Sequence, residues 1–98
     1  MMFLLYEVHP QPSHPEYGTI DGAFASMWVN KAVQAPAETV ALEFLQANRW
    51  DVEALEEAYF VTLDTYADGD IGRDRFEQAL IDGVVATFFR WPVGAPEE

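Results

Sequence analysis

Three prolines stand within six residues near the start of the chain, at Pro10, Pro12 and Pro15, and an apolar segment lies on either side of them. Proline fixes its own φ angle and has no backbone N–H, so these residues cannot form a regular strand or helix. We therefore expect a stiff loop here, with one strand before it at residues 3–8 and a second after it at residues 22–33. The fold then begins with two strands that no helix separates.

Two later segments have helical patterns. Pro36 suits the first turn of a helix, and apolar residues follow it at helical spacing as far as Asn48, which can take the left-handed position at a helix C-terminus. A shorter amphipathic helix is expected from about Asp74, and Gly83 ends it.

Residues 50–63 fit two periodicities, because some of their apolar residues alternate with acids as in a strand while others lie at helical spacing. The Tyr-Phe-Val-Thr cluster at residues 59–62 has high β propensity, which favours a strand interrupted near Glu56 and Glu57. Residues 84–91 are predicted to form a buried strand.

The expected element order is therefore ββαβαβ. It predicts an α+β fold, a two-layer sandwich in which two helices cover one face of a four-stranded mixed or antiparallel sheet. Half of the 98 residues are hydrophobic, which supplies one continuous core. We expect residues 1–92 to form a single domain and residues 93–98 to form a flexible C-terminal tail.

Three segments carry a resemblance: His-Pro-Glu-Tyr-Gly at 14–18, Met-Trp-Val-Asn at 27–30, and Phe-Glu-Gln-Ala-Leu-Ile-Asp-Gly at 76–83. Together with the aromatic strand that follows them, they resemble a group of small uncharacterised bacterial α+β proteins with ferredoxin-like architecture. The resemblance covers most of the chain and implies a ferredoxin-like arrangement. That group has no assigned activity, so the resemblance implies no functional residue.

The charge is strongly negative, with 17 acids against five Lys and Arg and a formal net charge of −12. Residues 51–72 hold seven acids and no base. Such a chain repels nucleic-acid phosphates and anionic lipid headgroups over a Debye length of roughly 8 to 10 Å, so we expect neither nucleic acid nor membrane as a partner. The acidic segment is a solvated face, a docking surface for a basic protein, or a cation site.

The chain has no cysteine, which excludes a disulfide framework, a thiolate zinc site and a thiol nucleophile. Its first residues lack the basic region of a signal peptide, and no segment approaches the roughly 20 apolar residues of a membrane span. We therefore expect a cytoplasmic protein. No phosphate loop, nucleotide fingerprint or nucleophile motif is present, so a cofactor is not expected and an enzyme is the less favoured class.

An acidic turn contains the best candidate for a metal site, at Asp64, Asp68 and Asp70. Aligned with a calcium-binding EF-hand loop from Asp64, the segment has acids at positions one and five and a glycine at position six. Position three is Tyr66, however, and position twelve is Arg75, where a bidentate glutamate is needed. The sequence therefore predicts at most weak divalent-cation binding.

The proline-rich loop carries the candidates for a ligand site. His9 and His14 could act as polar contacts, metal ligands or a general base, because the unperturbed pKa of histidine is near neutral. Tyr17 and Trp28 complete the expected ligand-binding set, with a small molecule held between the loop and the sheet. This alternative makes the chain a small-molecule-binding domain or a small enzyme.

The aromatic residues either fill the core or form an interface. Residues 84–89 are apolar or aromatic on both faces of their expected strand, whereas two helices on one side cover only one face. The main hypothesis is a non-catalytic interaction domain, a homodimer or a module that docks a basic protein. The expected interface residues are Trp28, Phe88, Phe89 and Trp91.

Overall fold

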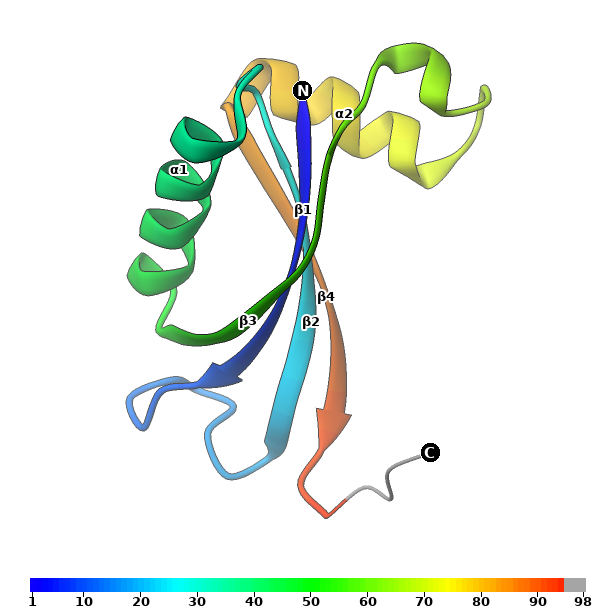
Figure 1. Cartoon of the computed structure of the whole chain (residues 1–98). Coiled ribbons are helices and arrows are strands. Elements are labelled where there is room, and N and C mark those ends of the chain that lie inside the picture. Colours follow the sequence, from blue (N-terminus) through cyan, green and yellow to red (C-terminus); the bar gives the residue numbers. More distant parts are fainter. Residues whose placement is uncertain (95–98) are drawn as a thin grey trace.

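The computed structural model describes residues 1–94 and has the order of elements that the sequence predicts (Figure 1). Residues 95–98, most of the predicted tail, lie outside the described part. The elements are β1 (Met2–Pro10), β2 (Ile20–Val29), α1 (Gln34–Ala47), β3 (Trp50–Phe60), a short 3₁₀ helix (Leu63–Thr65), α2 (Ile71–Asp82) and β4 (Val84–Pro92).

The four strands form one open sheet in the order β3-β1-β2-β4, and every neighbouring pair is antiparallel. The α+β class and the four-stranded sheet are therefore confirmed. The proline-rich loop joins β1 to β2 through turns, so no helix separates these strands. The ferredoxin-like alternative is not confirmed, because that arrangement begins βαβ.

Strand β3 resolves the ambiguity at residues 50–63. It pairs with β1 along its length, but the register shifts at two points. At the first, Leu5 faces Glu57 and Tyr6 faces Leu55, so Glu56 is an extra residue without a partner on β1. This is a β-bulge at the position where the sequence predicts an interruption. A second shift lies beside Glu53. Strand β3 ends at Phe60, three residues earlier than expected.

Helix α2 begins at Ile71, three residues before the predicted start at Asp74. The reason is local, since the side chain of Asp70 accepts a hydrogen bond from the Gly72 N–H at 2.9 Å and caps the helix N-terminus. Gly83 ends the helix as predicted, with a φ of 88° that favours glycine.

The inner face of the sheet packs against α1. It is built from alternate residues of β1 and β2 and from the buried residues Ala37, Ala41 and Leu45 of α1. Trp50 of β3 stacks on Phe88 of β4, with ring centroids 5.0 Å apart. This pair joins the two edge strands over the inner face. The sheet and α1 thus form a two-layer sandwich. The inner-face residues of β1 and β2 include Met2, Leu4, Tyr6, Val8, Ala23, Ala25, Met27 and Val29.

The outer face packs against α2, at one end only. Phe3 and Trp28 form an edge-to-face pair there, with ring centroids 5.1 Å apart, and Phe76 and Ala79 of α2 cover them. Phe3 is the neighbour of Leu4 in a strand, so the two side chains point to opposite faces. The prediction that both helices cover one face is therefore wrong. The continuous apolar run of β1 is typical of a strand that is covered on both faces.

Candidate functional site

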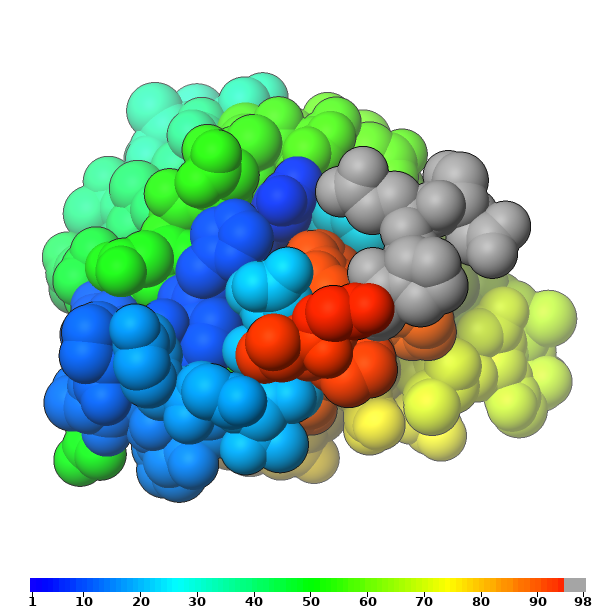
Figure 2. All heavy atoms as spheres, turned by 90° about the horizontal axis from the view of Figure 1, so that it is seen from below, coloured from blue at the N-terminus to red at the C-terminus, as the bar shows by residue number. Residues whose placement is uncertain are grey.

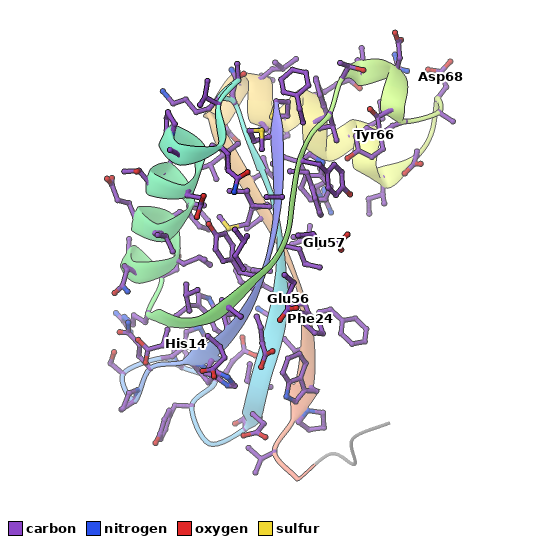
Figure 3. All side chains as sticks on the ribbon, in the orientation of Figure 1. His14, Phe24, Glu56, Glu57, Tyr66 and Asp68 are labelled. Atoms are coloured by element: carbon purple, nitrogen blue, oxygen red, sulfur yellow. The ribbon has the colours of Figure 1, made fainter. Side chains whose placement is uncertain are left out.

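The residues predicted to bind a ligand lie in three places. His9 at the end of β1 and Tyr17 in the proline-rich loop line one hollow of about 340 Å³. His14 lines another, of about 430 Å³, on the other side of the loop. Trp28 is only 7% exposed and lies under α2, where its indole N–H donates to the Tyr66 hydroxyl at 3.0 Å. Figure 3 shows His14 and Tyr66 at opposite ends of the sheet, so the four residues do not form one site.

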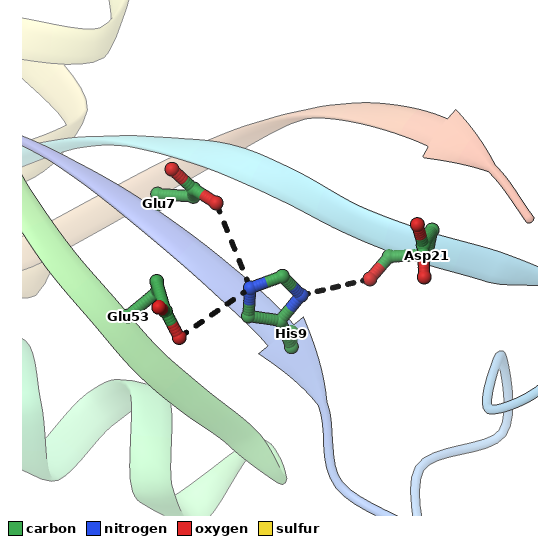
Figure 4. Close-up of polar contacts among 4 residues, drawn as sticks. All are labelled: Glu7, His9, Asp21 and Glu53. Carbon is green, nitrogen blue, oxygen red and sulfur yellow. Dashed lines mark hydrogen bonds and ion pairs between the residues drawn. The ribbon is translucent and has the colours of Figure 1, made fainter. Parts of the chain in front are cut away.

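His9 lies between two carboxylates on the outer face (Figure 4). Its Nδ1 is 2.8 Å from the backbone carbonyl oxygen of Asp21, so Nδ1 carries a proton and donates. Its Nε2 is 3.6 Å from Glu7 Oε2 and 3.7 Å from Glu53 Oε2. In the sequence, only the two-residue spacing of Glu7 and His9 indicates a shared face. Pairing between β1 and β3 adds Glu53.

The Glu7–His9–Glu53 cluster is an acidic surface rather than a metal centre. Within residues 1–94, no group of three His, Asp or Glu side chains is placed to hold a metal ion. No Lys or Arg pairs with Glu7 or Glu53 in this part of the chain. The cluster therefore presents negative charge that a cationic group of a partner can approach.

Within residues 1–94, the three aspartates of the acidic turn do not form a group of metal ligands. Asp70 caps α2, Asp68 pairs with Arg73 at 3.1 Å, and Asp64 lies in the 3₁₀ helix. Tyr66 and Arg75 also stand where an EF-hand loop needs oxygen ligands, at positions three and twelve. Two of the three aspartates thus have local partners, and weak divalent-cation binding at these residues stays a prediction.

An aromatic patch, formed by Phe24, Phe89 and Trp91, occupies the part of the outer face that α2 leaves uncovered. Phe89 is 72% exposed and Phe24 is 36% exposed. Phe24 and Trp91 are in contact, with ring centroids 5.1 Å apart. The Trp91 ring lies over Gly22, where an added Cβ would be 2.5 Å from the ring. A glycine in β2 thus lets the indole lie against the sheet.

Only half of the predicted interface residues lie in this patch. Phe89 and Trp91 do, but Trp28 is covered by α2 and Phe88 packs on the inner face against Trp50. Phe24 was missed, although it shares the strand parity of Trp28. An odd or even position along a strand indicates which face of the sheet a side chain is on. It does not show which end of that face a helix covers.

The two edge strands differ in charge. Strand β3 carries four exposed acids, Asp51, Glu53, Glu56 and Glu57, and no base. Strand β4 carries no acid and one cation, Arg90, whose Nε is 2.8 Å from an oxygen of Glu16. Acids and bulges are the usual protection of an edge against pairing with another chain. Strand β3 has both, and β4 is regular along its pairing with β2 from Gly22 onward.

The hollow beside His14 lies between the proline-rich loop and the end of α1. Its lining is His14, Pro15, Glu16, Ala47, Asn48 and Arg49. Arg49 has a φ of 66° and is the only residue other than glycine with positive φ in the described chain. This backbone costs an arginine roughly 1 kcal/mol or more, because its Cβ crowds the following carbonyl.

In the view from the loop end, the proline-rich loop and the end of β4 lie side by side (Figure 2). The Val93 N–H donates to the Thr19 carbonyl at 3.3 Å and joins the two segments.

Comparisons with protein-family models, with curated proteins and with solved structures found no match. The resemblance to small bacterial α+β proteins therefore stays a prediction. No helix among residues 1–94 is long and apolar enough to cross a membrane.

Proposed function

We propose that this chain is a non-catalytic interaction domain that forms a homodimer through β4 and the aromatic patch beside it. The observation that carries the proposal is the coincidence of a regular edge strand that has no acid with Phe89, which is 72% exposed on that same strand. A large aromatic side chain at this exposure is favourable to bury, by about 25 cal/mol for each Å² of apolar surface.

The distribution of charge favours a second copy as the occupant. In a two-fold arrangement β4 meets β4, and the strand has no acid to repel its equivalent. The four acids of β3 lie on the opposite edge of the sheet, so they point away from the contact. Antiparallel pairing of two β4 strands also places the two aromatic patches side by side on one continuous outer face.

A basic protein is a second candidate partner, and the Glu7–His9–Glu53 cluster favours it. The cluster lies on the β3 side of the outer face and lacks a Lys or Arg partner within residues 1–94. Charges of this kind raise the association rate of an oppositely charged protein more than they raise its affinity. The two contacts use different parts of the sheet and do not compete.

Sedimentation velocity across a wide concentration range tests the homodimer. We expect the wild-type chain to be dimeric, and we expect Phe89→Asp to weaken the dimer at least 30-fold, about 2 kcal/mol, because a hot-spot aromatic is replaced by a charge. Ile81→Asp is the matched control, since Ile81 is 79% exposed on α2. A chain that stays monomeric at every concentration contradicts the proposal. Equal weakening by both variants would contradict the role of the patch.

A further inference from the structure

Arg49 occupies a backbone position that suits glycine better. It follows Asn48 at the end of α1, its N–H donates to the Gln46 carbonyl at 3.0 Å, and its own carbonyl accepts from the Gln11 N–H at 2.9 Å. Glycine makes both hydrogen bonds and adopts a positive φ without strain. The backbone therefore does not require arginine here, and the side chain needs a role of its own.

The Arg49 side chain is held in place and keeps most of its donors. One terminal nitrogen, Nη1, donates to the Ser13 carbonyl at 3.0 Å, which fixes the guanidinium against the proline-rich loop. A guanidinium has five N–H donors in a planar fork, so the others remain for a ligand. Arg49 lines the hollow of about 430 Å³, and this volume is within the usual range for small-molecule sites.

His14 contributes a second donor to the same hollow. Its Nδ1 accepts a hydrogen bond from the Glu16 N–H at 3.0 Å, so the proton of the neutral ring is on Nε2. The ring packs on Trp50, with centroids 4.3 Å apart, which holds its orientation. Nε2–H is then a donor on a ring that lines the hollow.

The carboxylate that lines the hollow, Glu16, is already paired. Both Glu16 oxygens contact Arg90 Nε, at 3.0 and 2.8 Å. Near the end of α1, the N–H groups of Asn48 and Arg49 donate to the carbonyls of Phe44, Leu45 and Gln46, and the Asn48 side chain donates to the Phe44 carbonyl at 2.8 Å. Among the side chains that line the hollow, Arg49 is the charged group without an opposite partner in the described chain. It lies beside the partial negative charge of the α1 C-terminus, so the hollow matches at most a single negative charge.

We propose that this hollow binds the carboxylate of a small organic acid, with Arg49 and His14 as the donors. A planar monoanion fits the guanidinium fork and can accept from both side chains. A phosphate dianion is less suited, because one guanidinium does not balance its charge within a chain of net charge −12. The carboxylate could come from a free acid or from the C-terminus of a peptide.

Amide and side-chain NMR titrations test the site, at constant ionic strength. The probes are acetate, benzoate, N-acetylalanine as a model of a peptide C-terminus, and inorganic phosphate. We expect shifts confined to residues 11–18 and 46–50 together with the Arg49 Nε–H, and a weaker response to phosphate. Tighter binding of benzoate would indicate a free organic acid as the source of the carboxylate, and tighter binding of N-acetylalanine would indicate a peptide C-terminus. Shifts that are absent, spread over the whole surface or larger with phosphate overturn the proposal.

The variant Arg49→Gly separates binding from a purely structural role. We expect its melting temperature to stay equal to or above that of the wild type, because glycine adopts the positive φ at this position without strain. Its affinity for the probe that binds best should fall at least 10-fold. Arg49→Asn, which also tolerates positive φ, should do the same. Lys31→Gly removes an exposed cation elsewhere and should not change binding. Unchanged affinity in Arg49→Gly, or a lower melting temperature in both Arg49 variants, overturns the proposal.

Discussion

The two faces of the sheet are built from neighbouring residues of the same strands, and their burial differs. On the inner face, α1 and the Trp50–Phe88 pair cover the strands from one edge to the other. On the outer face, α2 covers one end and leaves the aromatic patch and the Glu7–His9–Glu53 cluster exposed. The inner face is therefore complete within one chain. Association with another protein is to be sought on the outer face.

The exposed part of the outer face is itself divided. Strand β3 carries four exposed acids, with the exposed rings of Tyr59 and Phe60 at its end, whereas strand β4 carries aromatic rings and no acid. The acidic half attracts cations and repels a second copy. Contact with an apolar surface is favourable for the aromatic half, because it removes the rings from water. The same outer face thus offers two contacts with opposite dependence on salt.

The largest expected effect concerns the inner face. Leu45 is fully buried between α1 and the sheet, so Leu45→Ala removes apolar contacts and leaves a cavity. We expect the free energy of unfolding to fall by about 2 to 5 kcal/mol, measured by urea denaturation. Phe89→Ser, on the outer face, should change the monomer's stability by only about 0.5 kcal/mol. Comparable losses for both variants contradict the difference in burial.

A buried hydroxyl makes the inner face sensitive to alkali. Tyr6 is 2% exposed, and its hydroxyl has no hydrogen-bond partner among the described residues. Burial first, and then the charge of Glu38, raise the pKa of Tyr6 from 10.0 to about 12. Because the folded-state pKa is above the unfolded one, the stabilisation is complete below pH 10 and is lost as the pH rises toward 12.

Urea denaturation of the wild type and Tyr6→Phe across this pH range measures the effect. We expect the wild type to lose up to about 3 kcal/mol more than the variant, which has no ionisable group at this position. The variant should be equally stable or more stable at neutral pH, because no hydrogen bond is removed. Tyr59 also has a raised pKa, through burial and then the nearby Tyr66 and Glu57, and it remains in both proteins. Parallel pH profiles would rule out the role of Tyr6.

The smallest expected effect is the response of the outer face to salt. Each copy carries a formal charge of −12, so added salt screens the repulsion between two copies. We expect dimer affinity to rise about threefold to tenfold from low to high ionic strength, measured by sedimentation. Binding of a basic test protein, measured by calorimetry, should weaken over the same range. A dimer that weakens with salt is held by charges rather than by the aromatic patch.

Local patterns predicted the elements well because their causes are local. The prolines excluded regular structure between β1 and β2, and Gly83 ended α2 at the expected residue. The β propensity of residues 59–62 correctly favoured a strand over a helix for β3. The start of α2 was placed too late, since the cap at Asp70 was interpreted as part of a turn.

The candidate sites were predicted less well, because each depends on residues that are distant in the sequence. His9 and His14 are close in the chain, yet the loop directs them into different hollows. Trp28 and Trp91 have similar side chains, but α2 covers the first and not the second. Arg49 was not singled out, because its signal is a backbone angle that no residue pattern reveals.

The sequence by itself determined the class and order of the elements, the net charge and the absence of thiol chemistry. Propensity, capping and composition act over a few residues or over the whole chain, so they can be read without a structure. Only the tertiary structure decided that the two helices take opposite faces of the sheet. Strands β1 and β2 are apolar on both parities, so each face can bury a helix, and the three-dimensional path of the chain sets which part of the outer face stays open.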